Sequence, residues 1–170
     1  MTSALDPLAY RRVVGRFATG VTIITTVLPG GERHALTCNS FTSVSLEPVL
    51  VLFCAEKVAR FHDAVLESGT WGVSVLSAGH VAASRHFAHR GRDLTTQFDQ
   101  VPVTAGPATG APLLVGALAV LECRTATTTD AGDHTVVVGE VLSATAADPA
   151  PDPLLYYAGG YRTVHAPEHA

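Results

Sequence analysis

The sequence predicts a mainly β fold, an antiparallel barrel or sandwich with helices at its ends. Short β-branched and apolar runs follow one another across tight turns, and two long strands are expected on either side of one turn near residue 130. The predicted strands also do not alternate regularly with helices, as they would in a doubly wound parallel sheet.

The first expected element is an amphipathic helix, because Asp6 is a preferred N-cap residue and Pro7 suits the first helical position. Residues 21–27 are almost all β-branched, which predicts a strand. Pro29-Gly30-Gly31 has turn composition, so residues 34–39 are expected to return as the hairpin partner of that strand.

A polar segment, 40–46, leads to the apolar run 49–54, which predicts a strand buried on both faces. The spacing of apolar residues over 57–66 predicts a helix. A strand is expected next over 71–76, and a short helix over 80–88.

Residues 90–112 are rich in glycine and proline and show little periodicity. A loop of that length usually has a function or covers something. Two long strands are expected over 113–125 and 134–145, around a turn at 129–132, and the aromatic cluster 154–157 follows them.

Composition places the chain among globular proteins. It has 170 residues, 47% hydrophobic and only 15% charged, so intrinsic disorder is excluded and another subunit is expected to cover part of its apolar surface. The net charge of −4 argues against nucleic acid and anionic membranes as partners. Glycine-rich nucleotide loops, Walker motifs and nucleophile-elbow serines are absent, which disfavours Rossmann dehydrogenases, P-loop enzymes and α/β-hydrolases.

The three cysteines are far apart and odd in number, so neither a disulfide framework nor a zinc ribbon is expected. No basic and apolar leader follows Met1, and the apolar runs 49–55 and 117–121 are too short to cross a bilayer. These observations predict a cytoplasmic protein that does not associate with a membrane.

The densest polar cluster runs from Thr37 to Ser45, between two apolar strands. Its short hydroxyl and amide side chains suit a phosphate or the edge of a heteroaromatic ring, although a polar edge strand would have the same composition. Lys57, the only lysine, follows an apolar strand and is either a phosphate partner or a solvated side chain.

His134 is expected at a strand end, where it either reaches a pocket at the barrel rim or satisfies turn carbonyls. Tyr161 and Arg162 form either a stacking surface for a planar ligand or part of a subunit interface. The histidines of segment 80–89 lack a cysteine or carboxylate at zinc-site spacing, so no metal is expected.

Motifs spread along the chain resemble the flavin reductase component of two-component flavin-dependent monooxygenases. They are Phe17-Ala18-Thr19-Gly20-Val21, Thr37-x-Asn39-Ser40-Phe41-x-Ser43-Val44-Ser45-Leu46-x-Pro48, Gly110-Ala111-Pro112, Glu122-Cys123, Gly132-Asp133-His134-x4-Gly139-x-Val141 and Pro153-Leu154-Leu155-Tyr156-Tyr157. The resemblance runs from about residue 8 to 162, so residues 1–170 are expected to be one flavin reductase-like domain with a short C-terminal tail.

The resemblance implies an FMN-binding split β-barrel, antiparallel and Greek-key-like, that forms a homodimer. It also implies reduction of FMN or FAD by NADH or NADPH, and delivery of the reduced flavin to a partner monooxygenase. The residues carried over to the flavin site are Thr37, Cys38, Asn39, Ser40, Ser43, Ser45, Cys54, Ala55, Lys57 and Arg60. His134, as the catalytic residue, and Tyr161 and Arg162 would border the nicotinamide.

In that reaction a hydride passes from nicotinamide C4 to flavin N5, so the protein's main task is to stack two rings about 3–3.5 Å apart. Departures from the family pattern at Val58-Ala59 and Arg92-Asp93-Leu94 leave the choice between FMN and FAD open. Two alternatives also stay open. One is a flavin- or haem-binding split-barrel protein without turnover, and the other is a pyridoxamine-phosphate-oxidase-like enzyme, whose basic phosphate cluster is not evident.

Overall fold

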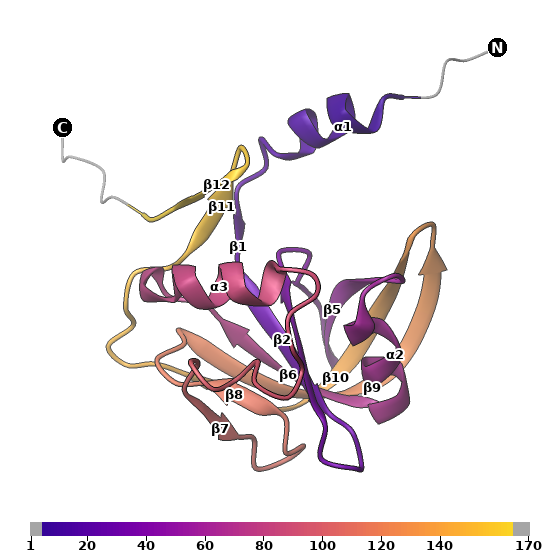
Figure 1. Cartoon of the computed structure of the whole chain (residues 1–170), viewed down its shortest axis with the longest axis vertical. Coiled ribbons are helices and arrows are strands. Elements are labelled where there is room, and N and C mark those ends of the chain that lie inside the picture. Colours follow the sequence, from indigo (N-terminus) through magenta and orange to yellow (C-terminus); the bar gives the residue numbers. More distant parts are fainter. Residues whose placement is uncertain (1–4, 165–170) are drawn as a thin grey trace.

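The computed structural model describes residues 5–164 and confirms a mainly β architecture with short helices (Figure 1). The first four residues and most of the expected C-terminal tail lie outside the described residues. Seven strands form one antiparallel sheet in the order β3-β2-β6-β9-β10-β5-β4. Their bounds are β2 (Thr22–Val27), β3 (Arg33–Cys38), β4 (Thr42–Leu46), β5 (Val49–Glu56), β6 (Thr70–Val75), β9 (Ala119–Ala131) and β10 (His134–Ala146).

The two edge strands of this sheet, β3 and β4, are consecutive in the chain and are joined only by residues 39–41. Seven strands laid flat would hold their edges about 29 Å apart. The connection spans at most about 14 Å. The sheet must therefore curl until its edges face each other, which makes a barrel open along one seam between β3 and β4. This is the split barrel that the motifs imply.

Two smaller sheets and three α-helices complete the fold of the described residues. The first sheet contains β1 (Thr19–Gly20), β11 (Leu155–Tyr157) and β12 (Gly160–Arg162), and the second contains β7 (Val103–Ala105) and β8 (Pro112–Leu114). The helices are α1 (Pro7–Val14), α2 (Arg60–Ser68) and α3 (Val81–Ala88). Within residues 5–164, no helix has the length and apolar character that crossing a membrane requires.

The expected strand over 113–125 is in fact two strands, β8 and β9. Gly116 lies between them with φ 79°, a conformation that glycine adopts without steric cost, so the chain turns there. β9 then continues further than predicted, and the turn into β10 lies at residues 132–133 rather than 129–132.

Two apolar clusters fill the fold. One lies inside the barrel around Phe53 and Trp71, whose rings meet edge to face at 4.9 Å, and it extends to Phe61 of α2. The other lies beneath α3, where Phe87 packs with residues of β2 and with Phe98 of the long loop. That loop therefore covers apolar side chains.

The prediction that the run 49–54 is buried on both faces is wrong. Val51 and Phe53 of β5 face the core, whereas Leu50 and Leu52 on the opposite face are only half-buried. An apolar run shows that a strand avoids water, but it does not tell whether the same chain covers both faces.

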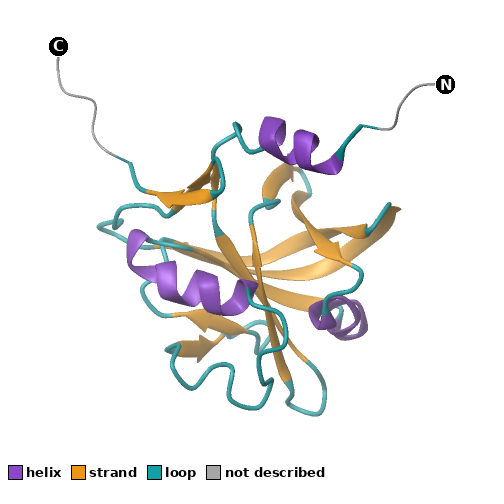
Figure 2. Cartoon of the chain, turned by 45° about the horizontal axis from the view of Figure 1, so that its top comes forward, coloured by secondary structure: helices purple, strands orange, loops and turns teal. Residues whose placement is uncertain are grey.

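α1 begins as predicted, because the Asp6 carboxylate accepts hydrogen bonds from the backbone N–H groups of Leu8 (3.0 Å) and Ala9 (3.2 Å). No residue of the helix is buried. Figures 1 and 2 both show α1 standing away from the barrel. Its apolar face is therefore uncovered in the single chain.

Candidate functional site

At the seam of the barrel, the central residues of the polar cluster lie close to the end of β5. Ser40, in the connection between β3 and β4, lies 3.0 Å from Cys38 Sγ, and its Oγ accepts a hydrogen bond from the backbone N–H of Cys54 (2.9 Å). Ser40 thus ties the end of β3 to β5 across the seam. Burial raises the pKa of the Cys38 thiol, so this cysteine is kept neutral and is no nucleophile.

The other predicted residues of the seam differ in what they can offer a ligand. Asn39 is exposed, and within residues 5–164 its side chain has no hydrogen-bond partner. Ser43 and Ser45 lie on β4 on either side of a register shift. Thr37 already donates to the Ser84 carbonyl (2.7 Å), and Ala55 points into the core, so Ala55 can offer only backbone groups.

A second group of predicted residues meets at the tip of the β9–β10 hairpin. The backbone N–H of Lys57 donates to the Asp133 carbonyl (3.0 Å), and Lys57 Nζ lies 3.2 Å from Asp130 Oδ1. His134 Nδ1 donates to Asp133 Oδ1 (2.7 Å), and this hydrogen bond lowers the pKa of the Asp133 carboxyl. His134 is thereby oriented and half-exposed beside the end of β5.

Tyr161 lies on β12 and touches a residue that sequence reasoning missed. The hydroxyls of Tyr161 and Ser84 are 2.8 Å apart, and Ser84, on α3, is completely buried. Because the Ser84 carbonyl also accepts from Thr37, one buried serine connects the seam strand β3 to the C-terminal hairpin. Arg162 is exposed and donates to the carbonyl of Tyr161. Within residues 5–164, no hydrogen bond or ion pair joins His134 to Tyr161 or Arg162.

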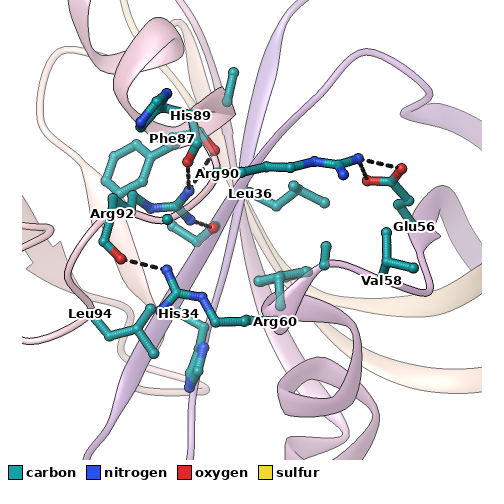
Figure 3. Close-up of a pocket in the computed structure, with 15 residues that line it drawn as sticks. His34, Leu36, Glu56, Val58, Arg60, Phe87, His89, Arg90, Arg92 and Leu94 are labelled. Carbon is teal, nitrogen blue, oxygen red and sulfur yellow. Dashed lines mark hydrogen bonds and ion pairs between the residues drawn. The ribbon is translucent and has the colours of Figure 1, made fainter.

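A pocket of about 200 Å³ lies between the start of α2 and the end of α3, next to β3 and the end of β5 (Figure 3). Three arginines line it, of which only Arg60 was predicted as a site residue. Arg90 donates through Nη2 to both carboxylate oxygens of Glu56, at 2.6 and 2.7 Å. Arg60 donates to the backbone carbonyl of Arg92. The sequence signal for Arg90 and Arg92 was the long loop that begins at residue 90.

Arg92 fixes the shape of this pocket. Its guanidinium donates to the carbonyls of Phe87 and His89 at the end of α3, to the carbonyl of Ala35 on β3, and to the side chain of Gln97. Burial, and then the nearby Arg60, lower the pKa of the Arg92 guanidinium. Arg92 remains a cation, and its position is set by backbone acceptors rather than by a carboxylate.

The histidines between residues 80 and 89 have structural partners. His80 Nδ1 lies 2.8 Å from Ser77 Oγ, its Nε2 lies 3.1 Å from the Val115 carbonyl, and His86 Nε2 lies 2.8 Å from the Gln97 carbonyl. Among the residues that the structure describes, no three histidine, cysteine or acidic side chains gather as a metal site would require.

Comparison with known proteins decides the family. Residues 14–165 match the family described as "Flavin reductase like domain". The chain belongs to this family. The resemblance seen in the motifs is confirmed, and so is the split-barrel fold that it implies.

Relatives of this flavin reductase family member match it over nearly its whole length. An NADH-dependent FAD reductase of Streptomyces globisporus is 46% identical over 158 residues, 92% of this chain and 85% of the relative. The reductase subunit HsaB of a flavin-dependent monooxygenase of Mycobacterium tuberculosis is 39% identical over 165 residues, 95% and 84% of the two chains. The solved structure of the NADH:FAD oxidoreductase SgcE6 of Streptomyces globisporus C-1027, with NAD and FAD fragments, superposes with a TM-score of 0.88 at 43% identity, covering 99% of this chain and 100% of that one.

Two motifs of the flavin reductase pattern support the scaffold. The buried carboxylate of Glu122 accepts hydrogen bonds from the loop that leads to Gly110-Ala111-Pro112. Gly139 lies against the Trp71 ring, where a side chain would not fit. Neither residue lines the seam, so their contribution is to the stability of the barrel.

Proposed function

We propose that this chain is a flavin reductase that uses NADH to reduce FMN or FAD and supplies the reduced flavin to a partner monooxygenase. The similarity over nearly the full length to an NADH-dependent FAD reductase carries the proposal. Similarity to the reductase subunit of a flavin-dependent monooxygenase supports the choice of partner. We also propose that residues 1–170 form one such domain, and that its three free cysteines reflect a reducing, cytoplasmic location.

The residues at the seam fit a flavin. A flavin ring is flat and largely apolar, with polar atoms along one edge. Asn39 is exposed at the seam, the next residue, Ser40, is bonded to the backbone of β5 at Cys54, and one face of β5 carries half-buried apolar side chains. In this proposal Asn39, Ser43 and Ser45 offer polar groups to the ring edge. The backbone at Thr37, Cys38 and Ser40 shapes the wall beside it.

The phosphate-bearing chain of the flavin would extend from the seam past Cys54 and Ala55 toward Lys57 and Arg60. When bound, the flavin accepts at N5 a hydride from nicotinamide C4. The protein's own residues orient the two rings and exclude water, a task that needs no strong base. Tyr161 and Arg162 would border the nicotinamide from the C-terminal hairpin.

The oligomer we propose is a homodimer. Large apolar side chains are exposed by 47–86% on α1 and its C-terminal extension and on the β4–β5 hairpin: Leu8, Val13, Val14, Phe17, Val44, Leu46 and Val49. Patches of this kind on a chain with so few charges mark a protein interface. Sedimentation equilibrium should give twice the mass of 17.7 kDa, and a monomer would contradict the dimer.

The test of the function is anaerobic. The purified protein is mixed with FAD or FMN, NADH is added, and the visible band of the oxidised flavin is followed against a control without protein. Rapid bleaching is expected, and repetition with NADPH determines the nicotinamide preference. Binding of flavin without acceleration over the control would instead support a split-barrel carrier without turnover.

His134 should matter for turnover rather than for flavin affinity. Because its ring lies at the hairpin tip and is oriented by Asp133, we expect it to position the nicotinamide or donate a proton to reduced flavin. Replacing His134 with alanine should lower turnover about tenfold, a small effect for a proton-transfer group. Stopped-flow reduction and a flavin titration of the same protein measure the two properties. Loss of flavin affinity with unchanged turnover would contradict this role.

A further inference from the structure

The C-terminal hairpin β11–β12 is attached unevenly to the rest of the fold. β11 pairs with β1 on one side and with β12 on the other, so β12 is an edge strand, and within residues 5–164 it pairs with no other strand. Figures 1 and 2 both show the hairpin outside the seven-stranded sheet, on the side of α3. Any further attachment of β12 must therefore come from its side chains.

Tyr161 provides this attachment. Its hydroxyl lies 2.8 Å from Oγ of Ser84, which is completely buried together with Phe87 on the inner face of α3. The guanidinium of Arg85 lies over the Tyr161 ring, 5.6 Å from its centre, and the Tyr156 ring meets it at 5.7 Å. Because a buried hydroxyl needs a hydrogen-bond partner, Ser84 holds the tip of the Tyr161 side chain in one place.

Arg162 follows Tyr161 on β12 and depends on it for its position. Its guanidinium donates to the Tyr161 carbonyl (2.7 Å), and Nη1 would lie 2.9 Å from a Cβ added to Gly160. The side chain thus folds back along its own strand, and within residues 5–164 it forms no ion pair. An exposed cation without a carboxylate is available to an anionic ligand, and β12 determines where this cation stands.

Ser84 makes two separate connections to the proposed site. Its backbone carbonyl accepts from Thr37 Oγ1 (2.7 Å) on the seam strand β3, whereas its side chain binds Tyr161. Replacing Ser84 with alanine removes the second connection and keeps the first. The side chain can therefore be tested without disturbing the proposed flavin site.

We propose that Ser84 is a positioning residue for the nicotinamide substrate. By bonding to the Tyr161 hydroxyl it holds β12, and so it places Arg162 beside the nucleotide. The proposal rests on the proposed function, in which Tyr161 and Arg162 border the nicotinamide, and it makes Tyr161 an anchor. Without the bond, Arg162 takes more orientations, and ordering it weakens substrate binding without slowing hydride transfer once the substrate is bound.

The experiment measures the dissociation constant of NAD+ by calorimetry in the presence of oxidised FAD, and the kcat and KM for NADH. Ser84→Ala should raise the dissociation constant and the KM about fivefold, the effect of losing one hydrogen bond. The kcat and the dissociation constant of FAD should be unchanged, because the lost contact serves substrate binding alone. Tyr161→Phe removes the same bond from its other end, so it should match Ser84→Ala, and the double variant should be about fivefold rather than about 25-fold weaker.

The matched control is Ser74→Ala. Ser74 is another completely buried serine, and its Oγ accepts from the backbone N–H of Leu114 (3.0 Å) on β8 rather than from β12. This variant also loses a buried hydrogen bond, but it should leave NAD+ binding and the KM for NADH unchanged.

Normal NAD+ binding in Ser84→Ala together with weaker binding in Tyr161→Phe would overturn the proposal, because the Tyr161 hydroxyl would then contact the nucleotide itself. Effects that multiply in the double variant, or equal weakening in Ser74→Ala, would overturn it too. So would a wild type that neither binds NAD+ nor shows saturation with NADH. Failure of the wild type to reduce any flavin would refute the proposed function, while NAD+ binding still tests Ser84.

Discussion

Replacing Gly139 with alanine should lower the free energy of unfolding by about 3 kcal/mol, near the upper end of the range for overpacked cores. An added Cβ would lie 2.3 Å from Cζ2 of Trp71 and 3.1 Å from Cβ of Cys123. The Trp71 ring has no room to move, since it is fully buried, meets Phe53 edge to face, and donates through Nε1 to Thr125 Oγ1 (3.2 Å). For a chain of this size, the midpoint of thermal unfolding should fall by about 10 °C.

Two further variants separate this clash from the general effect of losing a glycine. Gly30→Ala should be neutral or slightly stabilising, because its φ is not positive and no atom lies within 4 Å of the added Cβ. Made on a Trp71→Phe background, Gly139→Ala should cost less stability than it does in the wild type, because the smaller ring leaves space for the methyl group. A Gly139→Ala protein as stable as the wild type would contradict the packing of Trp71 described above.

The elements that the sequence predicted well are those determined by nearby residues. Asp6 and Pro7 define the start of α1 within one turn, and the β-branched run 21–27 forms its strand whatever surrounds it. The split at Gly116 was missed because a glycine within an apolar run does not show where the chain changes sheet. The error at β5 is of another kind, since an apolar face looks the same in sequence whether the same chain or a second subunit covers it.

In the candidate site, too, the sequence indicates some residues and misses others. Asn39 and Ser40 stand out as a polar interruption between apolar strands, so sequence alone draws attention to the seam. Ser84 and Arg90 do not, because their partners Tyr161 and Glu56 lie 77 and 34 positions away along the chain. Only the curling of the sheet and the position of α3 bring these pairs together. Motifs therefore identify residues of the proposed flavin site more readily than the residues that orient them.

Replacing Glu122 with alanine should lower the free energy of unfolding by about 4 kcal/mol at pH 7, because several buried donors to a charged acceptor lose their partner. Glu122 is 1% exposed. Its Oε1 accepts from the backbone N–H of Ala108 (2.9 Å) and from the N–H and hydroxyl of Thr109 (both 2.8 Å), and its Oε2 accepts from Ser143 Oγ (2.8 Å). Glu122→Gln keeps the shape and one of the two acceptor oxygens, which can still take the three bonds from Ala108 and Thr109, so it should cost about 1–2 kcal/mol, the difference between charged and neutral hydrogen bonds.

Wild type and Glu122→Gln should differ in the free energy of unfolding, and the pH dependence of that difference tests whether the charge of Glu122 itself stabilises the fold. Burial alone would raise the pKa of Glu122, but the hydrogen bonds from Thr109, Ser143 and Ala108 outweigh it and lower the pKa below the ordinary value of 4.5. A depressed pKa means that the folded state holds the proton more weakly than the unfolded state. The stabilisation is therefore complete above about pH 4.5 and is lost as the pH falls through the folded-state pKa.

The free energy of unfolding should therefore be measured for the wild type and Glu122→Gln by chemical denaturation, at pH 7 and at successively lower pH. The difference between the two proteins should become smaller below pH 4.5. The pKa values of the Asp93 and Asp133 carboxyls are also lowered, so these two groups titrate in acid as well. They are present in both proteins, so the difference between the two isolates Glu122. If this difference in the free energy of unfolding stays constant or grows as the pH falls, Glu122 stabilises the loop at Gly106–Pro112 by its shape alone. That result would contradict the assignment of a buried, ionised carboxylate that holds the loop in place.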